Sequence, residues 1–281
     1  MGTRKKATRG RAPRFSVRWR SIRTCRKLIS CYTALELDQG RPAEAMVRLI
    51  DQVKQGGANP NLFTGLVQAC RFVGLLDASL AAHARARRLE PRIATSVQNS
   101  LWMAGEYQQA IDAGAGKPLS EPTTALALMV LGRQTEARAV LDGALENPDY
   151  QGGHPFLRQW FQALRAVADG DRAAALATLK QIDLHQAEAD PEFLYCLGVW
   201  FVPAGDAEQA LSLIEKAVRK GFFCYPWMMR DSLLDPLRTT AEFQTLLAQV
   251  EARHRDARAA FTQAGGYDVL GLTLSASNSS S

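Results

Sequence analysis

The chain of 281 residues lacks three features that would have fixed its class at once. It has no apolar run long enough for a membrane span, no Cys-x-x-Cys pair, and no alternating pattern of β-branched residues. Its most apolar stretch, residues 195–203, is about half the 18 or more residues of a membrane helix. The sequence therefore predicts an all-α protein without a membrane span.

The five cysteines are odd in number and widely scattered, at Cys25, Cys31, Cys70, Cys196 and Cys224. This distribution argues against a disulfide framework and favours a reducing compartment. The basic N-terminus also lacks the apolar segment of a secretory signal. We therefore expect a cytoplasmic protein in which Cys70 and Cys196 pack as small apolar residues.

Acidic residues are absent from residues 1–27, which contain eleven Lys or Arg and leave 23 basic against 28 acidic residues in the remainder. The formal net charge of +6 therefore combines a basic arm with a mildly acidic body. Self-repulsion and low apolar content predict that residues 1–24 are a disordered arm. Two alternatives stay open, which are weak contact with nucleic acid through these cations and an upstream linker or misassigned start.

Catalytic patterns are also weak, so we expect no enzyme, no cofactor and no metal site. The stretch Ala113-Gly-Ala-Gly-Lys-Pro118 has Ile111 and Pro118 at key positions of a phosphate loop, and no strand is predicted before it. His185, Glu188 and Asp190 provide three metal-ligand types within six residues, but they lie between predicted helices and imply no fourth ligand. His83 and His254 lie on predicted helices and are expected to face solvent.

A repeat is present instead. Six glycines are each followed five residues later by a small residue, at intervals of 34, 31, 27, 38 and 35 residues. The pairs are Gly40/Ala45, Gly74/Ser79, Gly105/Ala110, Gly132/Ala137, Gly170/Ala175 and Gly205/Ala210. A glycine permits the left-handed turn between two helices, and the small residue lets their backbones approach. The period predicts stacked helical hairpins, with residues 62–73 and 78–89 as one example.

These units resemble the tetratricopeptide repeat, whose unit is a 34-residue helical hairpin. The sixth unit matches best, through Leu197-Gly198, Phe201, Gly205, Ala210 and Ala217. The first, third and fifth units are degenerate, and in the third the second helix is cut short by residues 113–118. The resemblance implies a right-handed α-solenoid of about six hairpins over residues 25–220.

Residues 221–261 resemble the closing segment of bacterial tetratricopeptide proteins, through Gly221-Phe-Phe-Cys-Tyr-Pro226 and Leu234-Asp-Pro-Leu-Arg238. In such proteins the array is often fused behind a kinase, a cyclase or a winged-helix domain. Asp231 and the pair Thr239-Thr240 are predicted to cap short helices, and the aromatic residues to cover the last repeat. Residues 262–281 are expected to form a disordered tail.

In this family the first helix of each unit lines a concave groove, through the second, fifth, ninth and twelfth repeat positions. The resemblance therefore implies a peptide-binding or partner-binding groove formed by Asn61, Thr64, Gln68, Arg71, Arg92, Thr95, Asn99 and Trp102. In later units the same positions are largely apolar, such as Leu126, Met129 and Tyr195. Either the groove is hydrophobic there or those helices face another element.

The sequence thus predicts a non-enzymatic scaffold that binds a protein or peptide partner in the groove of a repeat array. Its anchors would be the aromatic and arginine side chains. Two alternatives belong to other classes. The first is a sensory or regulatory module of a signalling or transcription system whose effector domain is absent from this chain, and the second is nucleic-acid association through residues 1–24.

Overall fold

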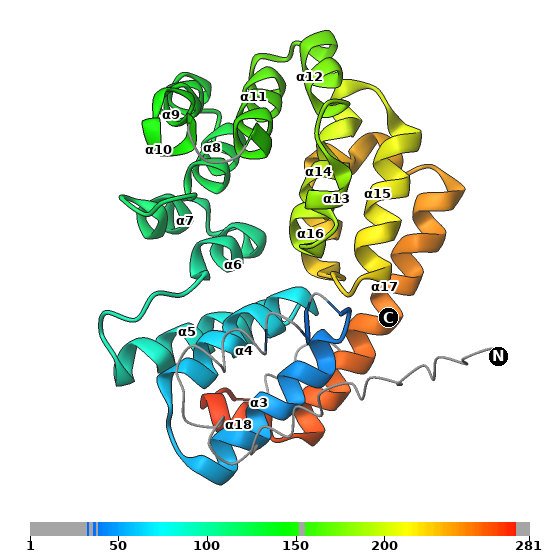
Figure 1. Ribbon diagram of the computed structural model, residues 1–281. Coiled ribbons are helices and arrows are strands. Elements are labelled where there is room, and N and C mark those ends of the chain that lie inside the picture. The colour runs from blue at the N-terminus through cyan, green and yellow to red at the C-terminus, as the bar shows by residue number, and fades with distance from the viewer. Residues whose placement is uncertain (1–32, 34–35, 38, 152–154, 274–281) are drawn as a thin grey trace, which may run out of the picture.

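In the computed structural model, residues 33, 36–37, 39–151 and 155–273 are described, and every regular element among them is a helix (Figure 1). The helices, in chain order, are α3 (Pro42–Gly56), α4 (Pro60–Phe72), α5 (Leu76–Leu89), α6 (Val97–Ala104), α7 (Tyr107–Gly114), α8 (Glu121–Val130), α9 (Gln134–Glu146), α10 (Pro148–Gln151), α11 (Pro155–Asp169), α12 (Arg172–Leu179), α13 (Leu184–Ala187), α14 (Pro191–Ala204), α15 (Ala207–Arg219), α16 (Tyr225–Arg230), the 3₁₀ helix η1 (Ser232–Leu237), α17 (Ala241–Gln263) and α18 (Gly266–Leu270). The all-α prediction is confirmed for this part of the chain.

Neighbouring helices pack as pairs, as the repeat predicts: α4 with α5, α6 with α7, α8 with α9, α11 with α12, and α14 with α15. All six glycines of the sequence pattern have positive φ, between 73° and 89°. The small residue five positions later is buried in every pair. The helix α7 is short and ends at Gly114, which confirms that the third unit is curtailed. The first helix of the first unit lies largely outside the described residues.

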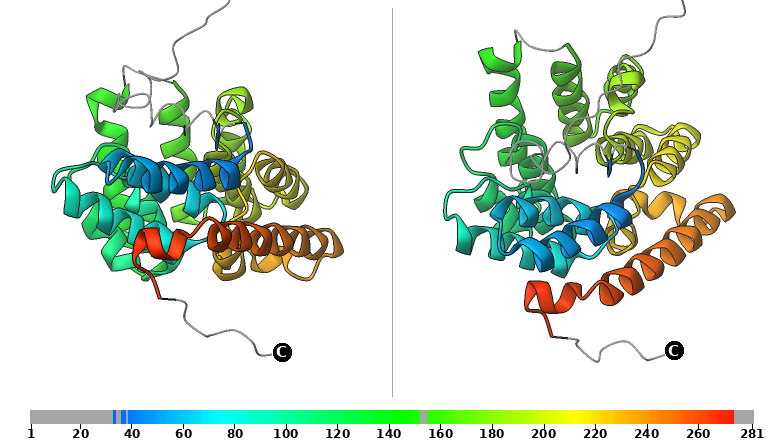
Figure 2. Two further views of the ribbon diagram at one scale, coloured as in Figure 1. Left: turned by 90° about the horizontal axis from the view of Figure 1, so that it is seen from below. Right: turned by 60° about the horizontal axis from the view of Figure 1, so that its bottom comes forward.

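The array does not remain open at its two ends. The chain passes round from α4 through α8, α11 and α14, and α17 then returns to lie beside α3 (Figures 1 and 2). The next helix, α18, packs against both α3 and α5. At the junction the amide of Phe223 donates a hydrogen bond of 2.9 Å to the carbonyl of Phe72. The sixth hairpin and the segment after it are therefore joined to the first two hairpins.

Aromatic side chains fill the inner side of this closure. The ring of Phe222 lies 5.3 Å from that of Phe72 on α4 and 5.2 Å from that of Tyr195 on α14. The ring of Trp227 on α16 lies 4.6 Å from Tyr195. These side chains are nearly or fully buried. The apolar groove position Tyr195 therefore faces the C-terminal segment of the same chain.

The C-terminal segment departs from the sequence prediction at its end. The caps are as predicted, because Asp231 accepts from the amide of Leu233 at the start of η1 and Thr240 accepts from that of Phe243 at the start of α17. The expected disordered tail is wrong for residues 262–273. Gly265 makes a left-handed turn, and α18 then buries Leu270 against the body.

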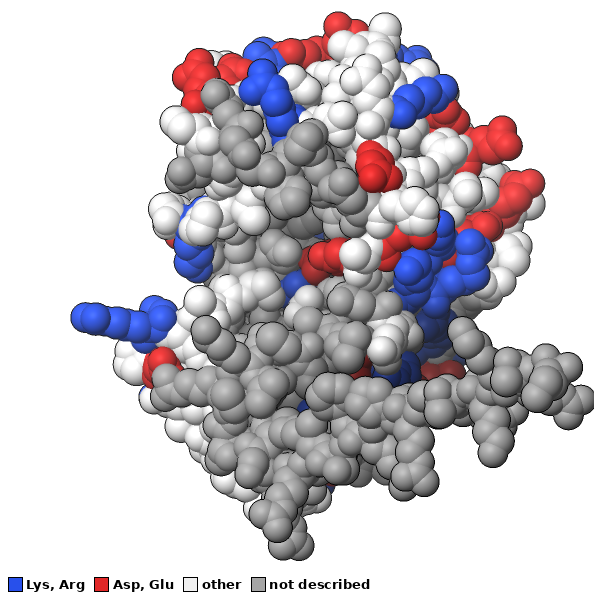
Figure 3. Space-filling model, in the orientation of Figure 1, with Lys and Arg blue, Asp and Glu red and all other residues white. Residues whose placement is uncertain are grey.

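Charged side chains of both signs are interspersed over the upper helices in Figure 3. Between α9 and α11, Arg165 pairs with Asp142 at 2.7 Å, and Arg138 pairs with Asp169 at 2.9 Å. Such exposed pairs contribute about 0–1 kcal/mol each.

The basic arm, residues 1–24, and its predicted interactions lie outside the described residues.

The side chain of His254 was expected to face solvent, but it is buried at the closure. Its Nδ1 donates to the carbonyl of Val73 at 2.7 Å, and Arg258 approaches its Nε2 at 3.3 Å. Burial lowers the pKa of this imidazole, and the positive charge of Arg258 adds to the effect. The ring is therefore neutral in the folded protein at neutral pH.

Acid is expected to loosen this contact. The folded-state pKa of His254 lies below its unfolded value of about 6.5. The stability that the neutral imidazole contributes is therefore complete above a pH of about 6.5, and it is lost as the pH falls from there through the folded-state pKa. Urea unfolding of wild type and His254→Asn should show a smaller loss of stability on acidification in the variant. Equal losses of stability on acidification in the two proteins would show that His254 does not cause the acid sensitivity.

Candidate functional site

Four of the predicted groove residues line one hollow in the structure. Asn61, Thr64 and Gln68 lie along one face of α4, and Thr95 lies in the connection between α5 and α6. The hollow has a volume of about 420 Å³ and is open to solvent. Its remaining walls include Ile93 and Ser96. These four repeat positions therefore lie close together in the structure.

Local hydrogen bonds fix three of these four side chains. Asn59 caps α4 and accepts from both the backbone and the side-chain amide of Asn61, at 3.0 Å and 3.1 Å. Thr64 donates to the carbonyl of Asn61 at 2.8 Å. The hydroxyl of Thr95 lies 2.7 Å from Nδ1 of His83. The amide of Gln68 makes no side-chain hydrogen bond within the described part of the chain, so its donor and acceptor are free for a ligand.

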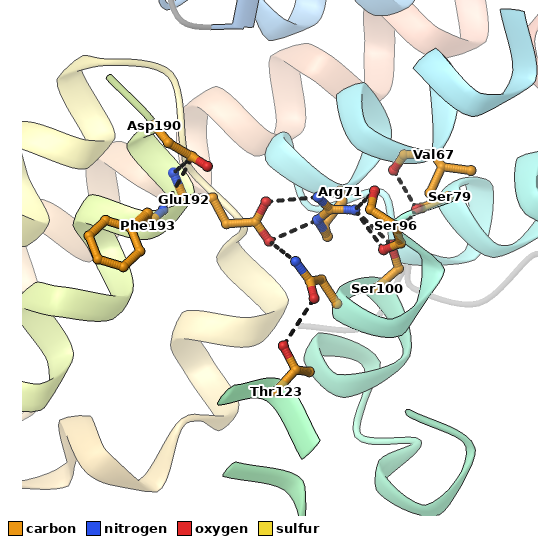
Figure 4. Close-up of polar contacts among 10 residues, drawn as sticks. Val67, Arg71, Ser79, Ser96, Ser100, Thr123, Asp190, Glu192 and Phe193 are labelled. Carbon is orange, nitrogen blue, oxygen red and sulfur yellow. Dashed lines mark hydrogen bonds and ion pairs between the residues drawn. The ribbon is translucent and has the colours of Figure 1, made fainter. Parts of the chain in front are cut away.

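Arg71 does not face the hollow. It is buried and forms a bidentate pair with Glu192 on α14, with Nε–Oε1 at 3.0 Å and Nη2–Oε2 at 2.7 Å (Figure 4). Its Nη1 donates to the carbonyl and hydroxyl of Ser96, at 3.2 Å and 2.9 Å, and to the hydroxyl of Ser100 at 3.3 Å. All three guanidinium nitrogens are thus used inside the protein, so Arg71 serves the closure and cannot anchor a peptide.

Asn99 and Trp102 are also occupied by the chain itself. Asn99 donates to Oε1 of Glu192 at 3.1 Å and accepts from the hydroxyl of Thr123 at 3.1 Å. The ring of Trp102 lies 4.5 Å from that of Trp227, and only 8% of Trp102 is exposed. Arg92 is exposed in the connection that leads to the hollow. Of the eight predicted residues, four therefore line the hollow, and Arg71, Asn99 and Trp102 form contacts across the closure. Arg92 is an exposed cation.

The sequence contained one signal for the closing contact. Glu192 occupies the same repeat position in the sixth unit that Asn61 occupies in the second, so it is itself a groove position. Arg71 and Glu192 are opposite charges at groove positions of units far apart in the chain. In an open array they could not meet. In a closed one they form the pair that the structure shows.

The other candidate sites have structural explanations. Asp190 caps α14 by accepting from the amides of Glu192 and Phe193, at 2.9 Å and 3.2 Å, and Glu188 pairs with Lys216. Among the described residues no cluster of His, Cys, Asp or Glu is placed to hold a metal ion. The glycine-rich stretch follows the helix α7, not a strand. These observations give the acidic residues near α14 capping and pairing roles and leave the glycine-rich stretch without the strand that a phosphate loop requires.

The cysteines that the structure describes are not reactive centres. Cys70 and Cys224 are buried and Cys196 is partly buried. Burial raises the pKa of the Cys224 thiol to about 12 and that of Cys70 further still. A thiol that stays protonated at neutral pH is a poor nucleophile.

Comparison with known proteins identifies no family. No protein-family model matches the chain, and no curated protein sequence matches it. Within the part of the chain that the structure describes, no helix combines the length and apolar character needed to cross a membrane.

Proposed function

We propose that this chain is a non-enzymatic protein-interaction scaffold of the tetratricopeptide type, a right-handed solenoid that binds an extended peptide of a protein partner. The paired helices, the glycine turns and the buried small residues support the repeat type. The bacterial and cytoplasmic assignments are part of the same proposal. The binding site is the hollow between the N-terminal ends of α4 and α6.

The observation that carries this proposal is the free amide of Gln68 in the hollow. A side-chain amide offers both a donor and an acceptor, which match the C=O and N–H of one peptide unit in an extended strand. Its neighbours Asn61, Thr64 and Thr95 are held by their own hydrogen bonds. The hollow is therefore preorganised, and a peptide does not have to order these three side chains on binding.

The chemistry of the peptide follows from the charge beside the hollow. Arg71 is neutralised by Glu192, so it presents no net charge to a ligand. Arg92 is exposed next to Ile93, which lines the hollow. We therefore propose a polar segment with an acidic residue that reaches Arg92, in place of an aromatic anchor on Trp102.

Affinity capture with the full chain as bait tests this function. The double variant Gln68→Ala/Arg92→Ala is expected to lose at least about tenfold in partner capture, because the free amide and the exposed cation are both removed. Gln68 makes no side-chain hydrogen bond to any residue that the structure describes, so helicity and the midpoint of urea unfolding should stay unchanged. Gln263→Ala, at the exposed end of α17, is the matched control. Undiminished capture by the double variant would show that the hollow is not the binding site for the partner.

A second candidate function is the sensory module. It is favoured by a separate small pocket between α6, α8 and α16, which has apolar walls and two charged side chains. A scaffold that only binds peptides has no need of such a pocket.

A further inference from the structure

The small pocket lies at the opposite end of α6 from the peptide hollow. Its lining combines Trp102 on α6, Leu126 and Met129 on α8, Trp227 and Arg230 on α16, and Asp231. Three segments that are distant in sequence meet here, because α16 packs against α6 in the closed array. The pocket thus exists only when the chain is closed.

The floor of the pocket is apolar and rigid. Trp102 and Trp227 meet edge to face, with their ring centroids 4.5 Å apart, and both are nearly buried. Met129 is partly buried beside them, while Val130 at the rim is 52% exposed. Such a floor favours a branched or thioether side chain, which gains by leaving water.

The size of the pocket limits its ligand. Its volume is about 210 Å³, below the range of about 300–1,000 Å³ that is usual for drug-sized ligands. A nucleotide or a folded element of a partner is too large for it. A single amino acid is of suitable size.

Two opposite charges stand side by side in the lining. Arg230 is exposed, and its Nη1 donates to the carbonyl of Met103 at 2.8 Å. Its other nitrogens have no hydrogen-bond partner within the described residues. Asp231 is half-buried, and its Oδ1 accepts from the amide of Leu233 at 3.0 Å. Among the residues that the structure describes, neither side chain belongs to an ion pair.

The environment of Asp231 indicates which charge is missing. Burial raises the pKa of this carboxyl group to about 6, although Arg238 acts in the opposite direction. The guanidinium of Arg238 donates to the backbone carbonyl of Asp231 at 3.0 Å and does not offset the burial of the side-chain carboxylate, so a further cation beside that carboxylate would stabilise its charged form. An ammonium group in the pocket would supply that cation, and a carboxylate would match the free donors of Arg230.

We infer that this pocket binds a free apolar α-amino acid of the size of leucine or methionine. The side chain packs on Trp102 and Trp227, the carboxylate pairs with Arg230, and the ammonium pairs with Asp231. A zwitterion satisfies both charges at once. An uncharged side chain of a partner protein satisfies neither, and a simple acid or amine satisfies only one. This site shares no residue with the peptide hollow, so the two proposals stand separately.

Calorimetric titration of the full chain with L-leucine tests the inference, and tryptophan fluorescence gives an independent readout. L-leucine is expected to bind with saturation and to change the emission, because the ligand contacts two indoles. The matched ligands are 4-methylpentanoate, which lacks the ammonium, 3-methylbutylamine, which lacks the carboxylate, and N-acetyl-leucinamide, which lacks both charges. Each should bind at least about tenfold more weakly than leucine.

Two variants test which residue binds the ammonium group of leucine and which binds its carboxylate. Asp231→Asn keeps the acceptor for Leu233, so it should fold normally, lose at least about tenfold in leucine affinity, and bind 4-methylpentanoate as well as wild type does. Arg230→Gln should show the reverse pattern and keep its affinity for 3-methylbutylamine. Arg255→Gln, on the exposed side of α17, is the matched control. Peptide capture should be unaffected in all three.

The inference is overturned if neither leucine nor methionine saturates the protein up to about 10 mM. It is also overturned if N-acetyl-leucinamide binds as tightly as leucine, since the pocket would then be a dock for a partner's apolar side chain. Unchanged leucine affinity in Asp231→Asn would likewise contradict it. The comparison of the four ligands uses the wild-type protein alone, so it still tests the inference if a variant folds poorly.

Discussion

Replacing Arg71 by methionine is expected to lower the free energy of unfolding by about 3–5 kcal/mol. Arg71 and Glu192 form a buried pair whose side chains are 1% and 9% exposed. Removing the guanidinium leaves the carboxylate of Glu192 buried, with Asn99 as its one remaining side-chain donor among the described residues. Urea denaturation followed by far-UV circular dichroism measures the loss.

Two further variants show whether the cost arises from the unpaired charge. Arg133→Met removes an exposed pair with Glu136, and the midpoint of urea unfolding should stay nearly unchanged because solvent screens that pair. The double variant Arg71→Met/Glu192→Met should recover most of the lost stability, because a buried pair can be replaced by apolar side chains at little cost. If the single and double variants were equally unstable, the unpaired charge would not be the cause.

Gly74→Ala is expected to have the second large effect. Gly74 has a φ of +79°, so alanine requires a left-handed backbone that costs about 1–3 kcal/mol. A Cβ at this position would also lie 2.8 Å from Nδ1 of His254 and 2.8 Å from Cδ of Pro226. His254 is held by Val73 and Pro226 is rigid. This overpacking adds about 1–3 kcal/mol.

Gly132→Ala is the matched control for this effect. Gly132 occupies the same repeat position with a φ of +73°, but an added Cβ would meet no atom within 4 Å in the described part of the chain, apart from its sequence neighbours. Its cost should therefore be the backbone contribution alone. The difference between the two variants reports the contact between the second hairpin and the C-terminal segment. Equal destabilisation of the two would indicate that no such contact exists in solution.

The hairpins could be predicted because their determinants are local. A glycine and a small residue five positions later decide the turn and the close approach of two consecutive helices, and both lie within one repeat. The expected tail at residues 262–273 failed for a related reason. Adjacent glycines such as Gly265 and Gly266 are typical of disordered tails, whereas here Gly265 makes the left-handed turn before α18 that brings Tyr267 against Phe261, with ring centroids 5.1 Å apart.

The closure could not be predicted, because it depends on pairs of residues distant in sequence. Nothing near Phe72 indicates that Phe222 will pack on it, and the charge of Arg71 has no visible partner within its own unit. The same limit applies to the site. The repeat position of Gln68 predicts a groove residue, and its side chain lines the hollow. Only the position of α14 decides that Arg71 and Asn99 are internal. Trp102 lines the amino-acid pocket because α16 lies against it.

Hydrogen exchange at the amide of Phe223 tests the central claim most directly, which is that the array closes on itself. This amide lies between α15 and α16 and bonds to the carbonyl of Phe72 across the closure. The closed array predicts that it exchanges as slowly as core amides of α14, and that Arg71→Met accelerates it. Exchange at the rate of a free amide, while α14 stays protected, would show that the array is open.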